Sequence, residues 1–297
     1  MNTINKLPQG FSIGHCSDEY TGVTTIVCPE GAIGGVDVRG GAPGTHETDC
    51  LRNEKMMQKV NAVALCGGSA YGMGAIAGIM ECLREKGVGF PIENKVVPIV
   101  CGAVIYDLND KEYHYPTAKS GYKAAASVSS NDLRQGKVGV GAGATVGKIL
   151  GMSGACSSGL GIASVQVGKA LVTAVVCVNA LGDVVDPKTG KIVAGAKSNG
   201  KFIDTSRFIL ENAAKPSFGT NTTIGCILTD AKITKVQANK IASVAHNGLA
   251  KTISPVHTDF DGDTLFCLAS GKEEADFLAL EIAATQAVEQ AVLNAVK

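Results

Sequence analysis

Two long apolar runs that follow each other almost without a break constrain the fold of this chain. Residues 162–167 and 170–179 are rich in valine, leucine and alanine, and only Gly168 and Lys169 separate them. Parallel neighbours need a crossover of about a dozen residues, whereas an antiparallel hairpin closes through a two-residue turn. The two runs therefore predict adjacent antiparallel strands. They argue against a strict alternation of strands and helices around one parallel sheet.

The remaining periodic segments predict a layered α+β fold. Apolar runs predict strands at 63–65, 96–107, 222–228 and 264–269, and two strands joined by a turn within 11–28. Helical spacing of apolar residues predicts helices at 75–86, 121–129, 232–250 and 273–296. A glycine-rich loop is expected at 31–45, and the polar, turn-rich stretch 179–219 is expected to be a mobile connection.

Composition limits the classes of binding partner and the cellular compartment that we expect for this chain. The 27 basic residues balance the 27 acidic ones, which argues against nucleic acid or an anionic membrane and favours a small, neutral substrate. The ten cysteines are spread singly, as expected for buried thiols in a reducing compartment. Neither a signal peptide nor a run of about 18 apolar residues is visible, so the expected location is cytoplasmic.

The Asn221-Thr222 bond stands at the start of the apolar run 222–228 and has the form of a self-cleavage site. Cleavage before Thr222 would place a hydroxyl and a free α-amine on one residue. The amine pKa of roughly 7.7–8.0 would let it accept the proton of the hydroxyl. The alternative is an ordinary turn that enters a strand, because Gly, Asn and Thr are common in such turns.

Other polar segments offer partners for such a nucleophile. Asp261 and Asp263 flank a glycine before an apolar run, and they could orient a hydroxyl or simply form a turn. Asn179 ends a predicted strand and could donate its amide to an oxyanion. The glycine-rich segments 67–72 and 139–148 match neither common nucleotide motif, and the five histidines lack metal-ligand spacing. We therefore expect no cofactor and no metal.

Taken together, four segments resemble the DmpA-type aminopeptidases, a family that includes β-peptidyl aminopeptidases and the NylC nylon-oligomer hydrolases. The segments are GVDVRGGAPGT (35–45), GGSAYG (67–72), NTT (221–223) and VHTDFDGDT (256–264). The similarity runs from about residue 14 to residue 271. It implies a four-layer αββα sandwich like that of N-terminal nucleophile hydrolases, and a homo-oligomer, expected to be a tetramer. It also implies a single hydrolase domain, 1–297, that cleaves itself into 1–221 and 222–297.

The resemblance also implies roles for individual residues. Thr222 matches the family's nucleophile and Asn179 its oxyanion-stabilising asparagine, while Tyr106 and Lys148 match an active-site tyrosine and a lysine of the NylC branch. The pair Asp261 and Asp263 is similar to the NylC branch, whereas the β-peptidyl branch has Ser and Glu around the glycine. The expected activity is hydrolysis of peptide or other linear amide bonds through an acyl-enzyme. Two alternatives stay open, namely an acyltransferase similar to ornithine acetyltransferases and a non-catalytic relative that binds a small ligand.

Overall fold

The computed structural model describes residues 5–108, 113–213 and 220–297. These residues form a nine-stranded mixed sheet in the order β10-β11-β16-β18-β2-β4-β7-β3, with β1 paired to β2. The predicted hairpin is confirmed, because β10 and β11 pair antiparallel from Leu160 opposite Cys177 to Val167 opposite Ala170. The strands are β1 (Ser12–Ser17), β2 (Gly22–Val38), β3 (Thr45–His46), β4 (Lys59–Cys66), β7 (Val100–Val104), β10 (Leu160–Val167), β11 (Ala170–Asn179), β16 (Thr222–Ala231) and β18 (Thr264–Glu273).

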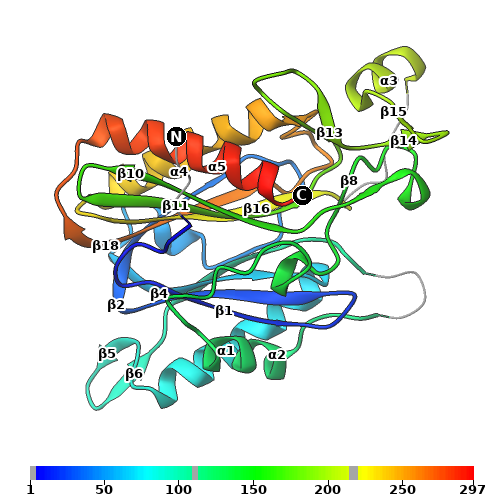
Figure 1. Cartoon of the computed structure of the whole chain (residues 1–297). Coiled ribbons are helices and arrows are strands. Elements are labelled where there is room, and N and C mark those ends of the chain that lie inside the picture. Colours follow the sequence, from blue (N-terminus) through cyan, green and yellow to red (C-terminus); the bar gives the residue numbers. More distant parts are fainter. Residues whose placement is uncertain (1–4, 109–112, 214–219) are drawn as a thin grey trace.

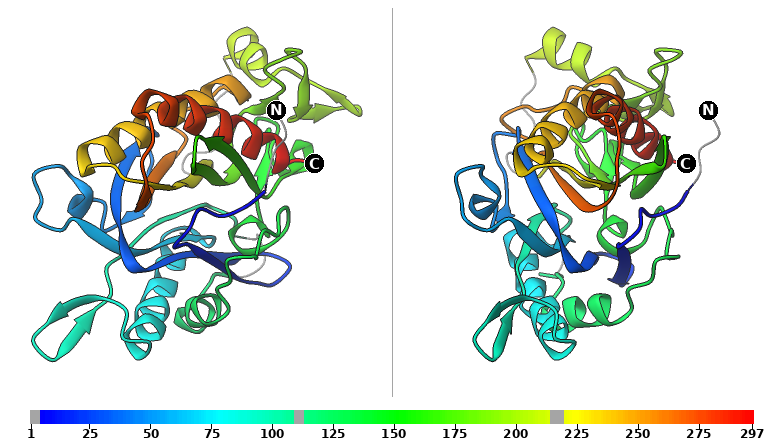
Figure 2. Two further views of the ribbon diagram at one scale, coloured as in Figure 1. Left: turned by 60° about the vertical axis from the view of Figure 1, so that its left-hand side comes forward. Right: turned by 90° about the vertical axis from the view of Figure 1, so that its left-hand side faces the viewer.

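Strand β2 divides this sheet into two stacked layers. Its first half pairs with β1 and β4, and its second half pairs with β18, so the 17-residue strand belongs to both layers. Helices α4 (Lys235–Thr252) and α5 (Phe277–Asn294) cover the layer of β10, β11, β16 and β18, as Figure 1 shows. Helices α1 (Gly74–Glu85) and α2 (Ala118–Ala126) cover the layer of β1, β2, β4 and β7 from the opposite side (Figure 2). The predicted αββα sandwich is confirmed.

Apolar side chains fill the three spaces between the four layers. Successive residues of a strand point to opposite faces, and β11 shows this clearly. Val172, Ala174 and Val176 pack in one cluster with α4 and α5. Val175 and Cys177 pack between the two sheet layers with residues of β4 and β16. A third cluster joins α1 and α2 to the outer face of β4. A strand buried on both faces explains why β11 reads as a continuous apolar run.

Short elements complete the chain at the rim of the sandwich. Two-stranded pairs form from β5 (Phe90–Ile92) with β6 (Lys95–Val97), β8 (Thr145–Val146) with β9 (Cys156–Ser157), and β14 (Lys197–Ser198) with β15 (Lys201–Phe202). A small sheet joins β13 (Ile192–Ala194), β12 (Asp183–Val185) and β17 (Ile253–Ser254). Single helical turns are η1 (Asp49–Leu51), η2 (Ser69–Met73), η3 (Gly139–Gly141) and η4 (Met152–Gly154), and α3 covers Thr205–Asn212.

The four helices that the sequence predicts are present, and capping residues shift the starts of three of them, α2, α4 and α5. Thr234 and Gln237 form a capping box, so α4 begins at Lys235 and not at 232. Strand β18 continues through Glu273, so α5 cannot begin there as predicted. The Asp276 side chain accepts the N–H of Ala279 and caps α5, which begins at Phe277. Thr117 caps α2, which therefore begins three residues earlier than predicted.

Two sequence predictions are wrong. The single strand at 96–107 is divided into β6 and β7, because Pro98 has no N–H to continue a ladder and β6 turns back onto β5. The loop at 31–45 belongs to β2 as far as Val38. Its glycines serve close packing, since a Cβ on Gly35 would overlap the backbone of Ala238 and Asn239 in α4.

The stretch 179–219, expected to be a mobile connection, is built in part from regular structure. It contains β12 to β15 and α3. Residues 214–219, which lead to the proposed cleavage bond, lie outside the described part of the chain.

Candidate active site

Thr222 and Asn179 lie side by side because β16 starts where β11 ends. Asn179 is the last residue of β11, Thr222 is the first of β16, and the antiparallel register pairs them directly. Directly opposed residues share a face and hold their Cβ atoms about 5 Å apart. That face is the inner one, because Ile224 and Cys226 follow Thr222 at spacings of two and pack between the sheet layers. Both polar residues are buried, at 5% and 1% exposure.

The peptide bond between Asn221 and Thr222 is held from both sides. The carbonyl oxygen of Asn221 accepts the N–H of Gly262 at 3.0 Å, and the Thr222 hydroxyl donates to the same oxygen. Asn221 also pairs with Asp261 as an isolated parallel bridge. A Cβ on Gly262 would lie 2.7 Å from both Thr222 Oγ1 and the carbonyl oxygen of Ala42, so only glycine fits between them. The Thr222 hydroxyl, the Asn221 carbonyl and the Gly262 N–H therefore meet at one peptide bond.

Lys148 and Asn179 hold the carbonyl of Thr220, the residue that precedes Asn221. Lys148 Nζ donates to the carbonyl oxygen of Thr220 at 2.8 Å, and to Asn179 O and Oδ1 at 2.9 and 2.8 Å. Asn179 Nδ2 donates to the carbonyl oxygens of Tyr106 at 3.0 Å and Thr220 at 3.4 Å. Burial lowers the pKa of Lys148 to about 7, although the negative charge of Asp261 partly opposes the shift. This lysine can therefore gain or lose its proton near neutral pH.

Asp261 and Asp263 flank Gly262, whose N–H contacts the bond, and the two carboxylates have different hydrogen-bond partners. Asp261 Oδ2 accepts the N–H and the hydroxyl of Thr258 at 3.1 and 2.6 Å, and its Oδ1 lies 3.5 Å from the N–H of Leu181. Burial, and secondly the charge of Asp263, raises the pKa of Asp261 to about 6. Asp263 Oδ1 accepts the N–H of Thr223 at 2.6 Å, so it fixes the start of β16 directly after the candidate nucleophile.

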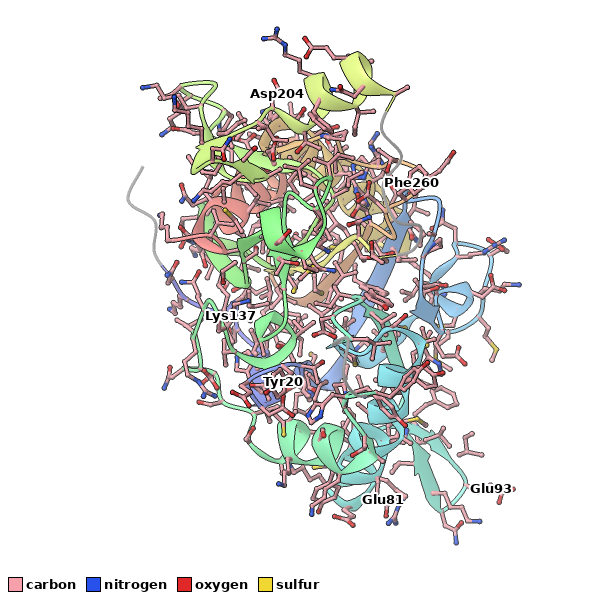
Figure 3. All side chains as sticks on the ribbon, turned by 90° about the vertical axis from the view of Figure 1, so that its right-hand side faces the viewer. Tyr20, Glu81, Glu93, Lys137, Asp204 and Phe260 are labelled. Carbon is pink, nitrogen blue, oxygen red and sulfur yellow. The ribbon has the colours of Figure 1, made fainter. Side chains whose placement is uncertain are left out.

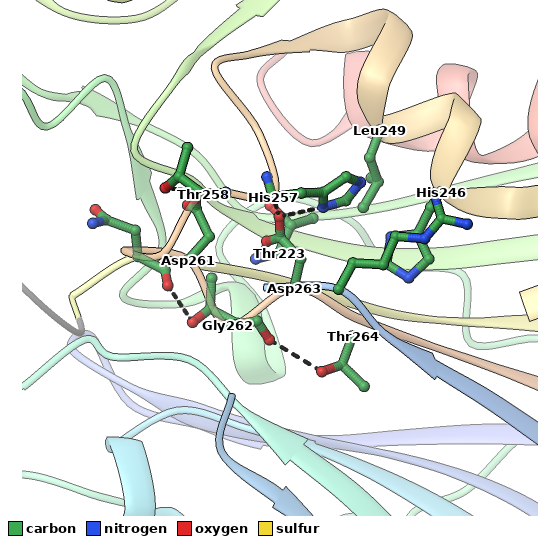
Figure 4. A network of polar contacts seen from close by, with 12 residues as sticks. Thr223, His246, Leu249, His257, Thr258, Asp261, Gly262, Asp263 and Thr264 are labelled. Carbon is green, nitrogen blue, oxygen red and sulfur yellow. Dashed lines mark hydrogen bonds and ion pairs between the residues drawn. The ribbon is translucent and has the colours of Figure 1, made fainter. Parts of the chain in front are cut away.

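His257 is a member of this network that sequence reasoning did not assign. Its Nδ1 lies 2.8 Å from Asp263 Oδ2, and its own N–H donates to the same oxygen at 3.1 Å (Figure 4). Its ring makes an edge contact with His246, at 4.7 Å between centroids. His257 has φ +57°, a left-handed conformation that is unusual for a residue with a side chain. The segment VHTDFDGDT contained the residue, but only the fold shows that it faces Asp263.

A pocket of about 600 Å³ opens on the side of the bond that faces Lys148. Tyr106, Lys148, Thr220 and Asn221 line it, whereas Thr222, the next residue in the chain, is not among its lining residues. Tyr106 contacts Asn179 through its backbone carbonyl, which accepts Asn179 Nδ2, and the residue also lines the pocket. Tyr20 and Lys137, both labelled in Figure 3, also line the pocket. Residues 220–221 thus form part of the pocket wall, directly before Thr222 in the chain.

The glycine-rich segments 67–72 and 139–148 take part in the packing of the fold. Gly68 donates its N–H to Asp107 Oδ1 at 2.6 Å, and η3 lies within 139–148. Across residues 5–108, 113–213 and 220–297, no group of three or more His, Cys, Asp or Glu side chains could hold a metal ion. In the same part of the chain, none of the helices combines the length and apolarity needed to span a bilayer.

Comparison with known proteins identifies the family. The model of peptidase family S58 matches residues 7–297, nearly the whole chain. The chain belongs to peptidase family S58. It is 39% identical to an uncharacterized aminopeptidase of Mycobacterium leprae, with 93% of this chain and 80% of the relative covered. It is 31% identical to a 6-aminohexanoate-oligomer endohydrolase of Paenarthrobacter ureafaciens, with 88% and 73% covered.

Two solved structures of similar fold each align with 98% of this S58 chain. A β-aminopeptidase of Burkholderia sp. gives a TM-score of 0.69 at 20% identity, with 86% of its own chain covered. An L-aminopeptidase D-Ala-esterase/amidase of Ochrobactrum anthropi, described as a variant of the Ntn hydrolase fold, gives 0.70 at 17% identity, with 85% covered. The expected family, the fold of N-terminal nucleophile hydrolases and the amide-hydrolase class are confirmed. The nucleophile, the cleavage bond and the residue roles stay predictions.

Proposed function

We propose that this S58 hydrolase cleaves its own Asn221–Thr222 bond and then uses Thr222 as an N-terminal nucleophile against peptide or other linear amide bonds. The observation that carries the proposal is the geometry of that bond. Its carbonyl oxygen accepts both the Thr222 hydroxyl and the Gly262 N–H, so nucleophile and oxyanion donor are in place before cleavage. The products are residues 1–221 and 222–297 of one domain.

Maturation proceeds through an ester. Thr222 Oγ attacks the carbonyl carbon of Asn221, the carbon–nitrogen bond breaks, and the nitrogen takes a proton to become the α-amine of Thr222. The Gly262 N–H, 3.0 Å from the carbonyl oxygen, stabilises the oxyanion that forms. Water then hydrolyses the ester, giving the carboxylate of Asn221 and the free hydroxyl of Thr222.

Turnover repeats this chemistry on a substrate. The α-amine of Thr222 accepts the hydroxyl proton, Thr222 Oγ attacks the substrate carbonyl, and water hydrolyses the acyl-enzyme. Asn179 Nδ2 stabilises the oxyanion, with Tyr106 lining the pocket beside it. Lys148 holds Asn179 through its Oδ1, and Asp263 positions the backbone at Thr223, with Asp261 beside it. The names of the relatives, an aminopeptidase and a 6-aminohexanoate-oligomer endohydrolase, support peptides and 6-aminohexanoate oligomers as the substrate class.

Intact mass of the purified chain tests the proposal. The wild type should separate into chains of 221 and 76 residues, whereas Thr222→Ala should stay whole. Thr223→Ala is the matched control, because it removes the neighbouring buried hydroxyl, which has no hydrogen-bond partner in the structure. It should cleave like the wild type. An uncut wild type after prolonged incubation, or a cut T222A, would contradict the mechanism. Acetyl transfer to an amine without amide hydrolysis would favour the acyltransferase alternative.

Assembly and location form the remaining part of the proposal. We propose a cytoplasmic homo-oligomer, a tetramer, on the resemblance to the DmpA-type family. All ten cysteines are free thiols, which supports a reducing compartment. Light scattering of the cleaved protein tests the tetramer.

A further inference from the structure

Two donors of His257 converge on one oxygen of Asp263. The backbone N–H of His257 lies 3.1 Å from Asp263 Oδ2, and the ring Nδ1 lies 2.8 Å from the same oxygen (Figure 4). An ionised carboxylate only accepts hydrogen bonds, so Nδ1 carries the ring proton. The Asp263 side chain is 1% exposed, and a buried carboxylate needs its oxygens hydrogen-bonded. His257 thus holds one of the two oxygens of this carboxylate.

The other oxygen of Asp263 is bound next to the candidate nucleophile. Asp263 Oδ1 accepts the N–H of Thr223 at 2.6 Å, and Thr223 directly follows Thr222 in β16. A carboxylate with one oxygen bound can rotate about its Cβ–Cγ bond, because that torsion has broad preferences. With both oxygens bound, its plane is fixed. The position of the His257 ring is therefore transmitted through Asp263 to the backbone beside Thr222.

A second histidine and an unusual backbone conformation place the ring of His257. His246 of α4 contacts it edge-on, and His246 Nε2 lies 3.0 Å from the carbonyl oxygen of Asp37. Burial lowers the pKa of His246 to about 4, so this neighbour is neutral at pH 7 and does not repel a proton on His257. The φ of +57° at His257 is costly for a residue with a side chain, and strain of this kind gathers at functional sites.

We propose that His257 is a positioning residue for Thr222: its ring N–H orients the carboxylate of Asp263, which fixes the backbone of β16 beside the nucleophile. His257 acts through Asp263 and takes no part in the bond changes themselves. This role rests on the proposed function, because it concerns the rate at which the Asn221–Thr222 bond is cleaved.

The alternative is that the ring only fills space, since the backbone N–H of His257 already reaches Asp263 Oδ2. Two substitutions separate these cases. Asn and Gly both tolerate a positive φ, so neither adds backbone strain at this position. Asn carries its amide nitrogen on Cγ, as histidine carries Nδ1, and can offer Asp263 the same donor. Gly removes that donor.

The test follows self-cleavage of protein synthesised in a cell-free extract and sampled over time by intact mass. His257→Asn should cleave within about threefold of the wild-type rate, whereas His257→Gly should be about tenfold slower, because it loses a hydrogen bond to a charged group. Glu93→Gly is the matched control, because it places Gly at φ +52° in the exposed turn between β5 and β6. It should cleave like the wild type.

A double-mutant cycle with Asp263→Asn shows whether the effect passes through the carboxylate. If it does, H257G should slow the D263N protein by less than about twofold, whereas independent effects would slow it by a further tenfold or so. Urea unfolding of H257N and H257G in the T222A background shows whether both proteins are folded under the conditions of the assay.

The outcomes separate this inference from the proposed function. A wild-type chain that is never cut would overturn the proposed function. A cut wild type with equal rates in H257N and H257G, or with an effect of H257G that persists undiminished in D263N, would overturn the inference alone. If H257G does not fold, His257→Asp replaces it, because Asp tolerates a positive φ and has the shape of Asn without its N–H. A rate equal to that of H257N would then contradict the inference.

Discussion

Three N–H groups converge on the carboxylate of Asp263, and this makes the residue sensitive to a change of one atom. The donors are the backbone N–H groups of Thr223 and His257 and the ring Nδ1 of His257, at 2.6, 3.1 and 2.8 Å. Asp263→Asn would turn an amide N–H₂ toward at least one of them. A buried donor without a partner costs about 1–3 kcal/mol. We expect that loss of stability in urea unfolding.

The same substitution should slow self-cleavage about 10²-fold, because it moves the backbone next to Thr222. Intact mass over time measures the rate. Asp259→Asn is the control: it makes the same change of charge four residues away, at an exposed position. Equal cleavage rates in the two variants would mean that Asp263 has no positioning role.

Asp261 gives a pH prediction with a defined sign. Burial raises its pKa to about 6 in the folded state, above the ordinary value of 3.8. The folded protein therefore binds more protons than the unfolded chain between about pH 4 and 6. Its contribution to stability is present below pH 4 and is lost as the pH rises through 6, by up to about 3 kcal/mol.

Asp261→Asn removes this titration, and a T222A background keeps the chain whole in both proteins. Urea unfolding at pH 4, 5, 6 and 7 should show the Asp261 protein losing stability relative to D261N as the pH rises. Asp107, whose pKa burial also raises to about 6, cancels in the difference. A constant difference, or a gain with rising pH, would show that Asp261 is not the group that titrates.

At the scale of elements, the contact between β2 and α4 depends on Gly35. A Cβ at this position would overlap backbone atoms of Ala238 and Asn239, which cannot yield as a side-chain end can. Gly35→Ala should therefore destabilise the protein by about 3 kcal/mol. Gly74 at the start of α1 is the matched control, because its Cβ would meet nothing within 4 Å. Gly74→Ala should be neutral or stabilising by up to about 1 kcal/mol.

Denaturant midpoints of the two variants in the T222A background check this prediction. Equal urea midpoints for Gly35→Ala and Gly74→Ala would mean that β2 and α4 can move apart without loss of stability.

Gly35 also shows where sequence reasoning stopped. Periodicity is local, and it predicted β10, β11, β16 and the four long helices from their own residues. The role of Gly35 depends on a helix about 200 positions later, so a run of glycines could only be read as a loop. Pro98 could have marked the end of β6, but apolar residues stand on both sides of it. The sequence therefore predicted one continuous strand.

The residues of the candidate site also fall into two groups, those that the sequence indicated and those that only the fold shows. Asn179 and Thr222 could be placed at a strand end and a strand start, and Asp261 and Asp263 were candidates from their position before an apolar run. The resemblance alone supplied Lys148 and Tyr106. Gly262 and His257 were missed as functional residues. Their roles depend on the return of β18 beside β16, which brings Gly262 to the carbonyl of Asn221. No local spacing reports that contact.

At the scale of the whole molecule, cleavage should leave two chains that stay together. Residues 222–297 supply β16, α4, β18 and α5, and β16 lies between β11 and β18 in the middle of one sheet layer. Helices α4 and α5 cover that layer, so the second chain contributes to two layers and to the apolar cluster between them. Separation would expose this core. We therefore expect both chains to elute as one species in native buffer and to part only in denaturant.

Cleavage also changes how unfolding depends on concentration. The uncut T222A chain unfolds without releasing a fragment, whereas the cleaved enzyme must release the 76-residue chain from the 221-residue one. By mass action, its urea midpoint should rise with protein concentration more steeply than that of T222A. Comparing the two slopes removes any contribution from oligomer dissociation, which both proteins share. Equal slopes, or a 76-residue chain that elutes alone in native buffer, would show that the two segments do not depend on each other for the fold.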